Sequence, residues 1–136
     1  MIIDAKDMIV GRISTIAAKK ALLGETIDIV NCESALITGR KKEVIEKYIR
    51  KKNLGTFKGP FLHRAPEKIV RRIVRGMLPF KKSRGREAYK RVMCYIGMPK
   101  EFEGKEKLII EGAHISRVKT NYVRIKDISI GLGMQK

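Results

Sequence analysis

The sequence lacks most of the features that mark secreted proteins and metal-binding domains. It contains no tryptophan, a single glutamine and only two cysteines among its 136 residues. The cysteines, Cys32 and Cys94, are far apart and form no Cys-x-x-Cys pair, so the sequence predicts neither a disulfide framework nor a zinc site. We therefore expect two buried thiols in a reducing compartment.

Long apolar runs are also missing. No stretch approaches the ~18 consecutive apolar residues that a membrane-spanning helix needs, and the first ten residues carry early acids that a signal peptide would not have. A basic helix lying on a membrane surface is an alternative, but such helices usually present Trp, Phe or Leu outward. These absences predict a cytoplasmic protein without a membrane partner.

Signatures of nucleotide-binding and metal-dependent enzymes are absent as well. No Gly-x-x-x-x-Gly-Lys motif occurs, and the only Gly-x-Gly, at 131–133, has no third glycine. His63 and His114 are single, without the paired spacing of metal ligands. The sequence thus predicts no catalytic residues, no cofactor, no metal and no small-molecule substrate. A nucleotide-dependent enzyme stays the competing class, because the chain begins with a βαβ pattern.

What the sequence has in excess is positive charge. Lysine and arginine number 31 against 14 acids, which gives a net charge of +17. Residues 35–100 hold 20 cations and 4 acids, whereas residues 1–34 hold 4 cations and 5 acids. A charge so large and so unevenly placed requires an anionic partner, and it is typical of nucleic-acid-binding proteins.

The hydrophobic pattern predicts one α/β domain over residues 1–136. A strand at 1–3, a helix from Gly11 to Gly24 and a strand at 26–30 make a βαβ unit, whose two strands should be parallel. A loop is expected at 53–60 and a basic loop at 80–86. The remaining elements are expected as helices at 40–52, 66–79 and 87–91 and as strands at 92–96, 108–110 and 122–125.

The helix that begins at Pro66 has the clearest two-sided pattern. One stripe is apolar (Ile69, Val70, Ile73, Val74, Met77) and the other is basic (Lys68, Arg71, Arg72, Arg75). An ordinary solvated face would carry both signs of charge to form i, i+4 pairs, but Glu67 is the only acid here. We therefore expect the apolar stripe to pack on the sheet and the basic stripe, with the cations that follow it, to contact phosphates.

Three residues within the basic region allow two interpretations each. Gly76 and Gly85 permit either a close backbone approach, which in a basic region suits contact with a sugar-phosphate strand, or a simple turn. His63 could stack on a base or bond a phosphate, or it could be an ordinary loop histidine.

Several motifs resemble one known family. The segment Gly59–Arg91, with RGMLP at 75–79 and KKSRGREA at 81–88, is similar to the universal ribosomal protein thirteen of the large subunit, in its archaeal and eukaryotic branch. Residues 11–34, ITGRKKE at 37–43 and CYIGMP at 94–99 agree with the same family, whereas 101–136 match it weakly.

This resemblance implies a three-layer α/β/α fold around a four-stranded, mainly parallel sheet. It also implies a structural role without catalysis: binding of large-subunit rRNA, contact with neighbouring large-subunit proteins, and support of subunit assembly on cytoplasmic ribosomes. The RNA-facing region would be about 40–91. Arg72 is a candidate from the basic stripe, and the family motifs add further rRNA-binding candidates: Arg12, Arg40, Lys41, Arg71, Arg75, Lys81, Lys82, Arg84, Arg86 and Arg91.

Overall fold

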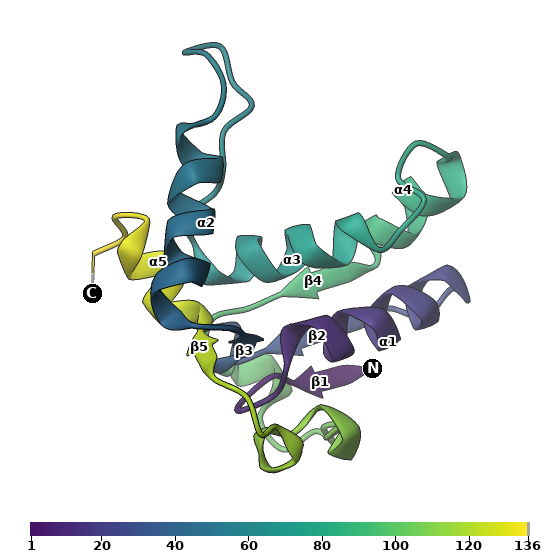
Figure 1. Cartoon of the computed structure of the whole chain (residues 1–136). Coiled ribbons are helices and arrows are strands. Elements are labelled where there is room, and N and C mark those ends of the chain that lie inside the picture. Colours follow the sequence, from purple (N-terminus) through teal and green to yellow (C-terminus); the bar gives the residue numbers. More distant parts are fainter. Residues whose placement is uncertain (136) are drawn as a thin grey trace.

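The structure is a computed structural model that describes residues 1–135 (Figure 1). A parallel sheet of three short strands lies at its centre. The strands are β1 (Ile2–Asp4), β2 (Ile27–Val30) and β4 (Val92–Cys94), in the order β1-β2-β4. The helix α1 (Val10–Leu22) joins β1 to β2, which confirms the predicted βαβ unit. The chain leaves α1 through Gly24, whose positive φ of 101° suits the left-handed end of a helix.

One face of this sheet is buried and the other is partly open. Ile3, Ile29 and Cys94 lie side by side across the three strands, and all are buried. On this side α1 packs against β2 and β4, and α3 (Pro66–Gly76) packs against β4 and α1. The neighbouring row is less covered, because Ile2 and Asp28 are half-buried and Met93 is 38% exposed.

The expected four-stranded sheet is wrong in one strand. Leu108, predicted within a strand at 108–110, makes only an isolated parallel bridge to Ile3 at the β1 edge. Its amide donates to the carbonyl of Ile2 at 2.8 Å, but the pairing does not continue. The strand predicted at 108–110 is therefore reduced to a single bridge, and the parallel sheet has three strands within the described residues.

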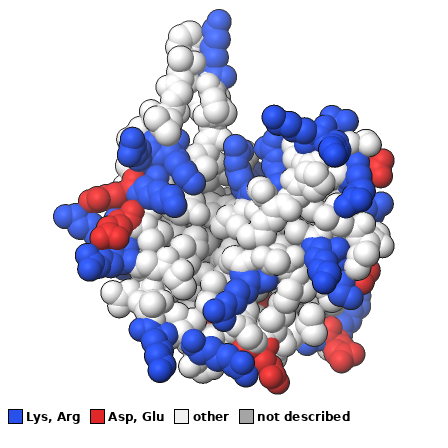
Figure 2. Space-filling view, turned by 45° about the vertical axis from the view of Figure 1, so that its right-hand side comes forward, with Lys and Arg blue, Asp and Glu red and all other residues white. Residues whose placement is uncertain are grey.

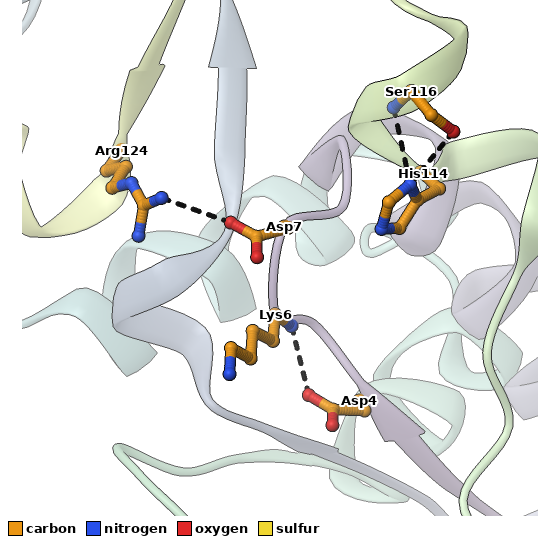
Figure 3. Close-up of polar contacts among 6 residues, drawn as sticks. All are labelled: Asp4, Lys6, Asp7, His114, Ser116 and Arg124. Atoms are coloured by element: carbon orange, nitrogen blue, oxygen red, sulfur yellow. Dashed lines mark hydrogen bonds and ion pairs between the residues drawn. The ribbon is translucent and has the colours of Figure 1, made fainter.

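A second, antiparallel sheet pairs β3 (Leu36–Thr38) with β5 (Tyr122–Arg124). The strand predicted at 122–125 is therefore confirmed, but it does not join the parallel sheet. Arg124 anchors β5 to the loop after β1 through an ion pair with Asp7 at 3.2 Å (Figure 3). In the same view the His114 ring accepts a hydrogen bond from the Ser116 amide at 3.3 Å, which gives this histidine a structural role.

The remaining helices agree with the sequence pattern except in two places. α2 (Lys41–Asn53) and α3 lie within a residue or two of their expected starts. α4 (Ser83–Lys90) begins four residues before the predicted start at 87, so most of the expected basic loop is helical. The helix α5 (Ile125–Gly131) had no counterpart in the sequence prediction.

A narrow arm, residues 54–63, projects from the end of α2 and returns to α3 (Figure 1). Its base is held by α5: the Lys52 ammonium donates to the carbonyl of Leu132 at 3.1 Å, and the Ser129 hydroxyl donates to that of Arg64. Because α5 contacts both α2 and α3, it fixes the angle at which the arm leaves the body.

Candidate nucleic-acid interface

The two faces of α3 are separated largely as its sequence predicts. Ile69, Val70 and Val74 are buried in the core. Ile73, on the predicted apolar stripe, is only half-buried, and Met77 is 41% exposed. The apolar stripe is therefore narrower than predicted, and its edge opens toward solvent beside the basic stripe.

Two arginines of the basic stripe pack on aromatic rings from the segment after α3. The Arg71 guanidinium lies over the ring of Tyr89 at 4.5 Å, and that of Arg75 lies over Phe80 at 3.9 Å. The Phe80 and Tyr89 rings themselves meet edge to face, 5.5 Å apart. Arg71 Nε also donates to the carbonyl of Val92 at 3.0 Å. These contacts connect α3, α4 and β4, and they hold both guanidinium groups in place.

Gly85 lies in the first turns of α4 and permits the basic segment to fold back on itself. A side chain there would place its Cβ only 2.1 Å from the carbonyl oxygen of Pro79. Gly85 is therefore required for a close approach to the backbone of its own chain, and the predicted contact of Gly85 with a sugar-phosphate strand stays a prediction. Gly76, by contrast, has open space where a side chain would begin.

This difference between the two glycines gives a direct test. We expect Gly85→Ala to lower the free energy of unfolding by about 1–3 kcal/mol, because the backbone at Pro79 must move away from the new methyl group. Gly76→Ala, the matched control at the end of α3, should leave stability unchanged or raise it by about 0.4–1 kcal/mol. Urea denaturation of both variants measures this, and equal stabilities would contradict the close approach.

Five of the predicted candidates form an open cationic surface on α3, on α4 and in the turn that joins these helices. Their side chains are exposed, and within residues 1–135 none has an ion-pair or side-chain hydrogen-bond partner. We call this set the basic surface: Arg72, Lys81, Lys82, Arg84 and Arg86. Figure 2 shows lysine and arginine side chains on both sides of a hollow at the foot of the arm, with few acids on this face.

Four further predicted candidates lie outside the basic surface, and each already has a hydrogen-bond or ion-pair partner. Arg12 donates from Nη1 to the carbonyl of Gly112, and Arg91 Nη1 donates to that of Ala21 at 3.3 Å. At the start of α2, Arg40 pairs with Glu43 and Lys41 pairs with Asp127, each at 3.3 Å. The eleven candidates therefore do not form one continuous patch.

A groove beside the basic surface was not predicted from the sequence. It has a volume of about 550 Å³ and lies between the arm and α3. Its lining includes Tyr48, Lys51, Leu54, Phe61, Leu62, His63, Lys68, Ile69, Arg72, Ile73 and Gly76. A second hollow of about 660 Å³ shares Arg72 and Gly76 with it and continues past Phe80 to Lys81 and Lys82. The sequence signal that could have indicated this groove is the pair of phenylalanines, Phe57 and Phe61, in a short glycine-containing loop.

Other kinds of site find little support in the part of the chain that the structure describes. No group of three or more His, Cys, Asp or Glu side chains there could hold a metal ion. Cys32 and Cys94 are buried free thiols, and hydrogen bonding to Cys94 together with burial raises the pKa of the Cys32 thiol. None of the described helices has both the length and the apolar composition to cross a bilayer.

Similarity to known proteins extends over almost the entire chain. The family model described as ribosomal protein L13 matches residues 1–101. Among curated relatives, a large ribosomal subunit protein uL13 from Archaeoglobus fulgidus is 47% identical over 137 residues, covering 98% of this chain and 88% of its own length. The uL13 proteins of Methanococcoides burtonii and Haloarcula marismortui are 43% and 40% identical, covering 97% and 100% of this chain and 96% and 92% of their own lengths.

These matches agree with the resemblance of the sequence motifs, and the relatives also match residues beyond 101, where the resemblance was weak. The chain belongs to the ribosomal protein L13 family, and its similarity to archaeal members spans nearly its full length.

Proposed function

We propose that the chain binds large-subunit rRNA through the basic surface and thereby supports assembly of the large ribosomal subunit. The observation that supports this proposal most directly is that five cations of α3, α4 and the turn between them are exposed and have no partner among residues 1–135. Like charges held together on a folded surface repel one another, so an anionic partner stabilises the arrangement. The phosphates of RNA provide that charge at regular spacing.

Family membership makes the chain a structural constituent of the large ribosomal subunit rather than an enzyme. Its partners are then rRNA and neighbouring ribosomal proteins, on ribosomes in the cytoplasm. We propose further that residues 1–136 act as one RNA-binding domain, with the RNA-facing region at about 40–91.

The eleven candidate residues would contribute in different ways. The basic surface contacts phosphates directly, because its side chains have no competing partner in the part of the chain that the structure describes. Arg71 and Arg75 present the free edges of guanidinium groups whose faces already lie on aromatic rings. Arg12, Arg40, Lys41 and Arg91 would bind RNA with the donors that their present contacts leave unused.

Salt dependence tests this proposal. Each neutralised phosphate should contribute about 0.7 to 0.9 to the slope of log affinity against log salt concentration. Contacts from the five residues of the basic surface alone should therefore give a slope of at least roughly 3.5 to 4.5 in magnitude, and the other candidates would make it steeper. Filter binding of the purified protein to large-subunit rRNA at several potassium concentrations measures the slope. A slope near zero would show that phosphates do not dominate the interaction.

A further inference from the structure

The groove between the arm and α3 differs in chemistry from the basic surface next to it. Its walls are mainly apolar, with Phe61 and Leu54 on the arm side and Ile73 on α3. Phe61 is 67% exposed and Leu54 is 60% exposed, so the apolar wall is open to solvent. Lys51, Lys68 and Arg72 are also part of the lining, so that one hollow combines apolar surface with three cations.

A surface that bound phosphates alone would not need this apolar wall. An unpaired nucleotide, however, has both chemistries: a flat apolar base and an anionic phosphate on each side of its sugar. The volume of about 550 Å³ lies within the ~300–1,000 Å³ typical of small-ligand sites. The groove also meets the second hollow at Arg72 and Gly76, so an RNA strand could pass from one into the other.

Two aromatic residues in the lining, Tyr48 and Phe61, could contact a nucleobase, each through a different group. The face of the Tyr48 ring already has the Lys51 ammonium 5.5 Å from its centre, whereas Phe61 has no such neighbour within the described residues. Burial raises the pKa of the Tyr48 hydroxyl, so this group stays protonated and can donate a hydrogen bond at physiological pH. Phe61 thus offers a stacking surface and Tyr48 offers a donor.

We propose that this groove receives an unpaired nucleobase of the bound RNA, stacked on Phe61, while Lys51, Lys68 and Arg72 hold the adjacent phosphates. The inference rests on the proposed function, because it names the kind of RNA segment that the protein recognises. In this site the arm forms one wall and α3 forms the other, and the projection of the arm from the body creates the space between them.

The experiment compares two single-stranded probes of equal charge: a ten-nucleotide oligoadenylate and an abasic analogue with the same number of phosphates. Stacking of one base on an aromatic ring contributes enough to change affinity by roughly fivefold or more. We expect the wild-type protein to bind the oligoadenylate at least about fivefold more tightly. Phe61→Ala should abolish this preference and leave affinity for the abasic probe unchanged.

Phe57→Ala is the matched control, because Phe57 is 87% exposed near the tip of the same arm and is not part of the groove lining. This variant should keep the preference for the oligoadenylate. If Phe57→Ala loses the preference, or Phe61→Ala keeps it, the base does not stack in the groove and the inference fails. Both variants should retain the wild-type melting temperature, which separates loss of stacking from loss of folding.

The same titrations separate this inference from the proposed function. Equal affinity for both probes, with a steep response to salt, would overturn the nucleobase site and leave phosphate binding intact. Absence of binding to either probe and to large-subunit rRNA would overturn the proposed function, and the nucleobase site with it.

Discussion

Replacing Arg84 and Arg86 together with glutamate should reduce affinity for large-subunit rRNA by roughly tenfold or more at physiological salt. Each change converts a phosphate attraction into a repulsion, and neither arginine has a partner among the described residues whose loss would disturb the fold. The dependence of log affinity on log salt concentration should also become shallower, by about 1.5 in slope, since two phosphate contacts are lost. Filter binding measures affinity, and sedimentation of tagged protein with large subunits measures incorporation in cells.

The control must change the net charge equally at a distant site. Arg117 and Lys119 are exposed cations that follow the 3-10 turn at Glu111–Ala113, and this segment lies well away from α4 in Figure 1. Arg117→Glu with Lys119→Glu should weaken rRNA binding much less than the α4 pair, because long-range attraction between exposed charges is screened beyond about 8–10 Å. Equal losses in the two double variants would show that total charge, and not the basic surface, determines binding.

Val74→Asp should unfold the protein. Val74 is fully buried on the core side of α3, so an aspartate there loses its hydration without gaining a partner. We expect the free energy of unfolding to fall by about 4 kcal/mol or more, which is comparable with the ~5–15 kcal/mol total of a typical domain. Far-UV circular dichroism and urea denaturation measure the effect.

Ile73→Asp, at the neighbouring residue, is the matched comparison. Ile73 is half-buried and lines the groove, so a carboxylate there keeps contact with water. Its cost should stay below about 1.5 kcal/mol. Unfolding by both substitutions would contradict the orientation of α3, and tolerance of both would place Val74 outside the core.

The local pattern predicted the elements whose residues alternate clearly between apolar and polar. The βαβ unit at the start of the chain and helix α3 fall into this class, because their apolar residues recur at the spacing of the element. The start of α4 was missed because Gly85 was assigned to a loop. In the structure this glycine is helical, and its missing side chain allows contact with Pro79.

The second sheet could not be predicted for a different reason. β3 and β5 are three residues each and are separated by more than 80 residues of chain, so neither carries enough alternation to indicate its partner. The same holds for α5, whose seven residues follow β5 directly. Its function depends on contacts with the base of the arm, which no local pattern encodes.

The charge pattern located the interface but did not rank its residues. Counting cations gives Arg71 and Arg86 the same weight, although one lies on Tyr89 and bonds the carbonyl of Val92 while the other is unpartnered among the described residues. The groove was missed because its two walls, the arm and α3, come together only in the folded chain.

The rigidity around Arg75 and Gly85 bears on how quickly and how tightly the protein associates. A flexible basic segment would lose conformational entropy on binding, at a cost of about 0.5–1.5 kcal/mol for each long side chain that becomes ordered. Here the guanidinium of Arg75 already lies on Phe80, and the backbone at Gly85 already contacts Pro79. For Arg75 and for the backbone at Gly85 that cost is met during folding, before RNA arrives, whereas the side chains of the basic surface become ordered on binding. The free protein thus presents the backbone of its binding surface and the Arg75 guanidinium in advance, which favours rapid capture over slow rearrangement of the backbone after the first encounter.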